Sequence, residues 1–173
     1  MSAPAAQGHD GRAFRLRRRP QKVVLTTHIL SSVGWFGIAI AVAFCAIAAA
    51  VSDDDALSRA LYRTLETLPW LSIPAGITAV GTGSLLGLGT TYGLVRYWWV
   101  IAKIIIAVAV VVTDVLIVVV VAHDAAVSGQ AQPPLYGSTI AHVVVLAVAT
   151  VLSVFKPWGR TPWVSRDRRA DAG

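Results

Sequence analysis

Residues 97–122 read YWWVIAKIIIAVAVVVTDVLIVVVVA, an almost wholly aliphatic run that carries two ionisable side chains, Lys103 and Asp114. A run of this length predicts a transmembrane helix, which needs about 20 mainly apolar residues. A charged side chain inside such a helix costs about 2.5–3.5 kcal/mol on insertion scales, so each one suggests a function. At about 100° per residue, the spacing of Lys103 and Asp114 predicts that both lie on one helix face, roughly 16 Å apart along the axis.

The rest of the composition fits a polytopic membrane protein. Of 173 residues, 55% are apolar and 14% are charged, which is typical of the membrane class. We therefore predict an all-α, four-transmembrane-helix bundle. Its spans are expected at about 23–51, 68–92, 97–122 and 138–155. A polar arm (1–22), expected to be disordered, and a basic tail (156–173) flank the bundle, and a short helix is expected around 56–64. The first span is too long for a cleaved signal peptide and is predicted to be retained.

Orientation follows from the basic residues. Only Arg59 and Arg63 lie between the first and second spans, whereas the opposite side collects the following residues: Arg12, Arg15, Arg17, Arg18, Arg19, Lys22, Arg96, Lys156, Arg160, Arg166, Arg168 and Arg169. The positive-inside rule predicts that both termini are cytoplasmic, in a bacterial plasma membrane. The net charge of +6 is then explained by anionic lipid and topology rather than by nucleic acid. The single cysteine, Cys45, excludes a disulfide within the chain.

Glycines in the second span predict how the helices pack. Gly76, Gly83 and Gly87 fall on one stripe, and Gly81, Gly89 and Gly93 fall on a neighbouring one. Small residues let membrane helices approach closely, so this helix is expected to be the hub of the bundle. A nucleotide-binding loop is the alternative for residues 81–87. Its glycine spacing is one residue too long, and it lies at membrane depth rather than after a soluble strand.

Four polar side chains are predicted at membrane depth, in two layers. His28 and Lys103 fall in the cytoplasmic half, and Asp114 and His142 in the outer half. Each has a structural alternative: Lys103 can extend to the headgroups, and His28 can donate to a backbone carbonyl or to Thr27 or Ser32. His142 can lie at the interface. The short Asp114 side chain must be protonated or paired inside the bundle, with Thr113, Thr139 and His142 as candidate partners.

His28 and Trp35 also form a candidate cofactor site. They are seven residues apart on one face of the first span. A neutral imidazole is a good ligand for haem or a metal, and a neighbouring indole can wall a planar cofactor. The candidate cofactor-binding residues are His28, Trp35, Lys103 and His142. No metal site and no catalytic residue is predicted, because the sequence contains no Walker, HExxH or GxSxG motif.

At these residues the chain resembles a family of small, largely uncharacterised bacterial integral membrane proteins. The resemblance covers residues 22–157. It rests on His28 to Trp35 followed by Gly37, on Arg96-Tyr97-Trp98-Trp99 with Lys103, and on His142 at the start of the last span. More distantly, the chain is similar to HemJ-type protoporphyrinogen oxidases and to copper-resistance D membrane domains. The HemJ resemblance implies haem b with His28 as ligand and Lys103 as partner. Copper pathways rely on soft sulfur ligands. The chain has only one Met and one Cys, so the copper function of the copper-resistance D domains is disfavoured.

Three functions remain open from the sequence. The first is a non-catalytic membrane component or subunit that packs on other membrane subunits or on a second copy through the aliphatic surface of the third span. The second is a haem b-binding redox protein that uses His28 with Lys103 or His142. The third is a small proton or solute translocator with Asp114 and Lys103 as relay points. Whether the protein is an enzyme is left open by these hypotheses.

Overall fold

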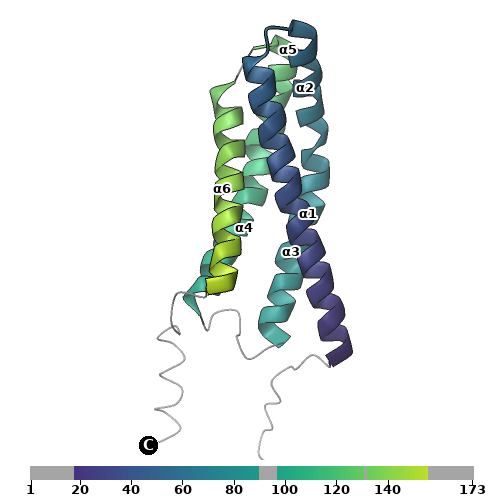
Figure 1. The fold of residues 1–173 in the computed structure, drawn as a ribbon, viewed down its shortest axis with the longest axis vertical. Helices are drawn as coiled ribbons and strands as arrows, with labels where there is room; N and C mark the ends of the chain where they lie inside the picture. The colour runs from purple at the N-terminus through teal and green to yellow at the C-terminus, as the bar shows by residue number, and fades with distance from the viewer. Residues whose placement is uncertain (1–17, 90–96, 131, 156–173) are drawn as a thin grey trace, which may run out of the picture.

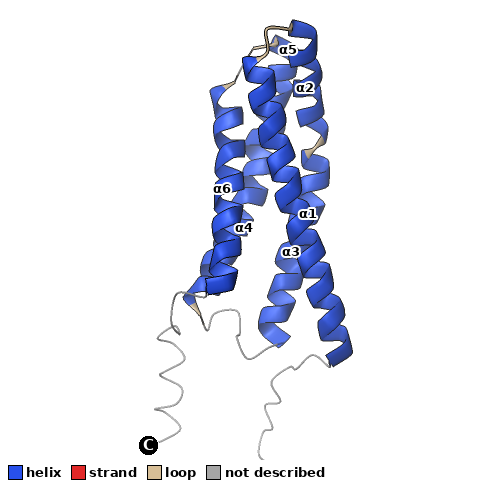
Figure 2. Ribbon diagram, in the orientation of Figure 1, coloured by secondary structure: helices blue, strands red, loops and turns tan. Residues whose placement is uncertain are grey.

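Four long antiparallel helical segments make up the described part of the protein. The computed structural model describes residues 18–89, 97–130 and 132–155, which are helical apart from short connections and contain no strand (Figure 2). The elements are α1 (Arg18–Val51), α2 (Asp55–Thr67), α3 (Pro69–Gly89), α4 (Trp98–Thr113), η1 (Asp114–Val118), α5 (Val119–Ser128) and α6 (Pro133–Phe155). Four segments are long and apolar enough to cross a membrane: Arg18–Val51, Asp55–Gly89, Trp98–Ser128 and Pro133–Phe155. The predicted all-α class with four such helices is confirmed.

The first two segments are longer than predicted. The described part of α1 extends from Arg18, whereas the first span was predicted from about residue 23. The short helix predicted around 56–64 is longer in the structure, where it forms α2. Asp54 caps α2: its side chain accepts hydrogen bonds from the N–H groups of Ala56 and Leu57. Leu68 alone separates α2 from α3, and its N–H still bonds to the carbonyl of Thr64. The second segment is therefore nearly continuous from Asp55 to Gly89.

The third segment also runs past its predicted end. The third span was predicted to stop near Ala122, but α5 continues to Ser128. Before α5, the segment passes through one π-helical turn, η1. His123 and Asp124 made this part resemble a loop, but His123 lies on the helix surface, 2.9 Å from Glu66 of α2. Gly129 ends the helix with φ at 68°, a left-handed conformation that favours glycine. Asp114 consequently lies near the middle of the segment Trp98–Ser128, whereas the predicted span placed it eight residues from its outer end.

The last helix begins earlier than predicted, at Pro133 instead of near Ser138. Pro133 and Pro134 were expected to close the preceding loop. Proline is well suited to the first turn of a helix, since its φ is already helical and its absent N–H has no partner there. This earlier start places His142 nine residues into α6 rather than close to its end.

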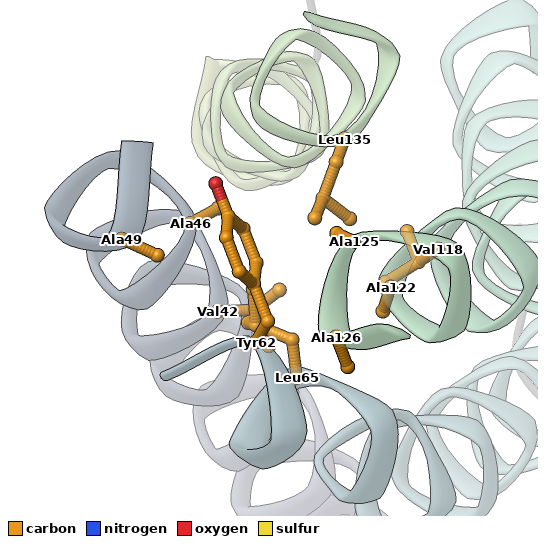
Figure 3. Packing of buried hydrophobic residues seen from close by; sticks show 10 residues of the cluster. All are labelled: Val42, Ala46, Ala49, Tyr62, Leu65, Val118, Ala122, Ala125, Ala126 and Leu135. Carbon is orange, nitrogen blue, oxygen red and sulfur yellow. The ribbon is translucent and has the colours of Figure 1, made fainter. Parts of the chain in front are cut away.

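The helices pack tightly at one end of the bundle and diverge toward the other. In Figure 1, α2 and α5 lie at the top, while α1 and α3 separate from α4 and α6 toward the bottom. The upper core joins α1, α2, η1, α5 and α6 around Tyr62 and Leu65, which are 1% and 0% exposed (Figure 3). Its members are Val42, Ala46, Ala49, Tyr62, Leu65, Val118, Ala122, Ala125, Ala126 and Leu135. This end holds the bundle together and leaves the other end free to enclose a cavity.

Candidate functional site

A cavity of about 590 Å³ lies between α1, α3, α4 and α6. Its wall is mainly apolar, and it carries His28 and Trp35 from α1 and Lys103 from α4. Ligand sites usually measure about 300–1,000 Å³ and combine apolar walls with a few polar groups. Three of the four residues that the sequence singled out for cofactor binding thus border one space of ligand size.

Glycines on α3 make room for the two α1 side chains of this cavity. A Cβ at Gly76 would lie 2.9 Å from the Trp35 ring, and one at Gly83 would lie 3.0 Å from Cε1 of His28. Gly76 and Gly83 are seven residues apart, as are Trp35 and His28. The antiparallel packing of α3 on α1 therefore matches one predicted glycine stripe to both side chains. Gly81, from the neighbouring stripe, has nothing within 4 Å of its Cβ position.

His28 is held by α3 through one ring nitrogen. Its Nδ1 lies 3.0 Å from the carbonyl oxygen of Ala79 and 3.2 Å from Oγ1 of Thr82. The carbonyl can only accept, so Nδ1 carries the proton and donates to it. In a neutral ring, Nε2 is then a lone-pair donor, and no described residue hydrogen-bonds to it. This arrangement, with one nitrogen fixed by a carbonyl and the other available, is the usual one for a ligating histidine.

Lys103 contributes a cation to the same cavity. Its Nζ donates a hydrogen bond to Oγ of Ser153 on α6 and lies 5.9 Å from the centre of the Trp99 ring. Among the described residues, no carboxylate lies within ion-pair distance of Nζ. The bond to Ser153 directs the ammonium inward, toward α6. Among the described residues, its charge has no anionic partner.

Asp114 and His142 form a second polar site, deeper in the bundle. Oδ1 of Asp114 lies 3.0 Å from Nδ1 of His142, and the two side chains are 8% and 9% exposed. The other oxygen, Oδ2, accepts a 2.7 Å hydrogen bond from Oγ of Ser72, and Ser72 accepts one of 3.0 Å from Nε1 of Trp35. Of the predicted partners, His142 contacts Asp114, whereas Thr113 and Thr139 donate to the carbonyls of Ala109 and Tyr136.

Lys103 of α4 and Asp114 of η1 both meet α6, in one antiparallel register. Lys103 contacts Ser153 and Asp114 contacts His142. The eleven-residue step from Lys103 to Asp114 therefore matches an eleven-residue step backward along α6, from Ser153 to His142. This agrees with the predicted placement of Lys103 and Asp114 on one helix face. It also produces the two predicted layers: His28 and Lys103 border the larger cavity, and Asp114 pairs with His142. His142 does not border the larger cavity, although it was a candidate cofactor residue.

Sequence reasoning missed Ser72 and Ser153. Each is a single small hydroxyl residue in an apolar helix, where serine often just bonds to its own backbone. Ser72 lies seven residues before Ala79 on α3, as His28 lies seven before Trp35 on α1, but this match becomes visible only when α3 is packed on α1. Searches against protein-family models, curated proteins and solved structures found no match. The site must therefore be interpreted from its own geometry.

Proposed function

We propose that this chain is a multi-pass protein of the bacterial plasma membrane that binds an amphipathic, anionic ligand between α1, α3, α4 and α6. The four long apolar helices cross the bilayer in this proposal, with both termini in the cytoplasm. Large apolar side chains such as Phe44, Ile105 and Val144 are 55–69% exposed on the outside of the bundle, as suits contact with lipid. The positive-inside pattern supports the orientation.

The observation that carries the proposal is an inward-facing cation beside an apolar cavity. Lys103 has no carboxylate partner among the described residues, and it borders about 590 Å³ of mainly apolar space. A charge in a low-dielectric environment is stabilised when an opposite charge joins it. A ligand with an apolar body and an anionic group would pack its body against the apolar wall and pair its charge with the ammonium of Lys103. The end of the bundle where α1 and α3 diverge from α4 and α6 also carries Arg18, Arg19 and Lys22 of α1, which favours an anion.

Haem b is the member of this ligand class that also uses His28. The residues fit it: Nδ1 of His28 is fixed by Ala79, Nε2 is the remaining ligand atom, and Trp35 walls the cavity. Lys103 would hold a propionate. When bound, haem b would supply one-electron redox chemistry. This choice corresponds to the second sequence hypothesis, a haem b-binding redox protein that uses His28 with Lys103.

An absorption titration tests the proposal. The full chain is purified in detergent and titrated with haem b, and the Soret band is followed for the wild type and for His28→Ala. We expect a saturable band in the wild type that shifts or disappears in His28→Ala. The control is His123→Ala, because His123 is exposed and bonded to Glu66 at the far end of the bundle.

The haem assignment is overturned if the wild-type protein gives no saturable band or if His28→Ala and His123→Ala give the same spectrum. The wider ligand class is tested separately, by native mass spectrometry of the protein extracted from its membrane. Retention of an anionic amphiphile that is lost in Lys103→Met supports the class. A wild-type protein that retains only neutral molecules contradicts it.

A further inference from the structure

A second cavity, of about 10 Å³, lies beside the Asp114–His142 pair. This volume is close to that needed by one water molecule. Its polar lining consists of Ser72, Asp114, Thr139 and His142, together with the indole of Trp35. The first four are 1–7% exposed, so the cavity is enclosed by the bundle rather than open on its surface.

His142 presents an unpartnered nitrogen in this buried setting. Its Nδ1 is 3.0 Å from Oδ1 of Asp114, but its Nε2 is fully buried and has no hydrogen-bond partner among the described residues. Leaving a buried polar atom unpaired costs about 1–3 kcal/mol. Such an atom next to a water-sized cavity indicates a small polar partner. Thr139 offers that partner a second contact, since its hydroxyl donates to the carbonyl of Tyr136 and can still accept.

The hydrogen bonds around Asp114 all point toward the carboxylate. Ser72 donates to Oδ2, Trp35 donates to Ser72, and Nδ1 of His142 faces Oδ1. Donors directed at a carboxylate stabilise its charged form. With a neutral imidazole the cluster then carries one negative charge inside an apolar bundle. Protonation of Nε2 makes the imidazole cationic and brings the pair to neutrality without breaking any of these bonds.

We propose that Asp114, His142, Ser72 and Trp35 form an intramembrane proton-binding site that exchanges its proton through one water in the small cavity. In the uptake step, a hydronium O–H bond breaks, an Nε2–H bond forms and water remains. The cluster charge changes from −1 to 0. Among described residues lining this cavity, Asp114 and His142 are the titratable ones; Trp35 and Ser72 on α1 and α3 and Thr139 on α6 are neutral. Lys103 and His28 border the other cavity.

This site is independent of the proposed ligand, because its proton-binding atoms do not border the larger cavity. Of the residues that the structure describes, Trp35 alone borders both cavities. The site also differs from a translocator built on Asp114 and Lys103. Here the acidic partner is the imidazole of His142, and Lys103 takes no part.

Histidine nitrogen NMR tests the site directly. The full chain is labelled with ¹⁵N-histidine, placed in lipid nanodiscs and titrated with acid, and signals are assigned with His→Gln variants. We expect His142 to change from a ring protonated at Nδ1 to a doubly protonated ring while the protein stays folded. His123, which is exposed and 2.9 Å from Glu66, is the reference in the same spectrum.

Two variants separate the parts of the site. Asp114→Asn should change the ¹⁵N signal of Nδ1 of His142, because Nδ1 then faces a neutral amide instead of Oδ1 of the carboxylate. Ala39→Val fills part of the small cavity while keeping every polar side chain that lines it, and should slow exchange of the Nε2 proton with solvent at least about tenfold. Glu66→Gln should change the ring-nitrogen signals of His123 alone.

The proposal is overturned if His142 stays neutral wherever the wild-type protein is folded. That result needs no variant, so it holds even if Asp114→Asn fails to fold. An unchanged Nδ1 signal of His142 in a folded Asp114→Asn would remove Asp114 from the site. An unchanged exchange rate of the Nε2 proton in Ala39→Val would remove the cavity water from the proposed exchange route.

Discussion

Trp35 and His28 determine how closely α1 packs on α3, since each occupies space that a glycine leaves open. Gly76 faces the Trp35 ring and Gly83 faces the His28 ring. Trp35 then bonds to Ser72 and His28 to the carbonyl of Ala79. Each aromatic side chain is thus fixed once by shape and once by a hydrogen bond, which is what a preorganised binding wall requires.

The glycine positions give a prediction at the residue scale. Gly76→Ala should lower the free energy of unfolding by about 1–3 kcal/mol, because the new Cβ would lie 2.9 Å from both Trp35 and Val111. Gly81→Ala is the matched control on the same helix: its Cβ would have nothing within 4 Å, and alanine favours helix by up to about 1 kcal/mol. Reversible unfolding in detergent measures both. Equal losses in the two variants would refute the close packing of Trp35 on α3.

Single residues also show what the sequence could and could not reveal. Lys103 and Asp114 were found because charges stand out in an aliphatic helix. Their partners were harder to find, since Ser72 and Ser153 look like ordinary small residues of membrane helices. Only the three-dimensional register of α3 on α1 and of α6 on α4 distinguishes them from the other serines.

At the scale of elements, the α2–α5 end of the bundle supplies the packing that the cavity end lacks. Tyr62 and Leu65 of α2 insert between α1, α5 and α6 (Figure 3). The sequence predicted α2 only as a short helix in a polar loop, because its surface is rich in charge. Its buried stripe repeats at helical spacing through Ser58, Tyr62 and Leu65, and this periodicity was the overlooked signal.

This packing makes a prediction for α2. Leu65→Ala should lower the free energy of unfolding by about 2–5 kcal/mol, as expected when a fully buried leucine is truncated. Leu57→Ala on the same helix should change it by less than about 0.5 kcal/mol, because Leu57 is 50% exposed. Chemical unfolding in one detergent compares the two. If Leu57→Ala were the more damaging variant, α2 would not be docked by its Tyr62–Leu65 face.

The π-helical turn η1 lay beyond sequence reasoning. In this turn the N–H of Val119 bonds to the carbonyl of Asp114, one residue further back than in an α-helix. The residues Asp114–Val118 are aliphatic apart from the first, and nothing in such a run marks a change of register. The turn begins at the one buried acid of the segment, which agrees with the frequent occurrence of π turns at functional positions.

For the whole molecule, length supports a membrane setting. The 34 residues of α1 extend about 51 Å, whereas the hydrocarbon core of a bilayer is about 30 Å thick. Both ends of the bundle should therefore project, with the charged surface of α2 on one side and the basic residues on the other. The four helices and their order could be predicted from hydropathy. The helix ends could not, because they depend on proline positions, on Gly129 and on contacts between α2 and α5.

Topology gives a prediction at this scale. A cysteine or protease site added after Gly173 should be inaccessible from outside intact cells, and one placed in the loop at Asp53 should be accessible, because the positive-inside rule predicts that the spans' basic flanks face the cytoplasm. Labelling with a membrane-impermeant thiol reagent, in a Cys45→Ala background, measures both sites. Labelling of the C-terminal site in intact cells would reverse the orientation.

The most direct measurement of the central claim is a comparison of haem b with its dimethyl ester. The two probes share one apolar body and differ in the charge of the propionates. We predict that the wild-type protein binds the free acid at least about tenfold more tightly, equivalent to about 1.4 kcal/mol, and that Lys103→Met loses this preference. Equal affinity of the wild type for both probes, or an unchanged preference in Lys103→Met, would contradict an anion-binding cavity at Lys103.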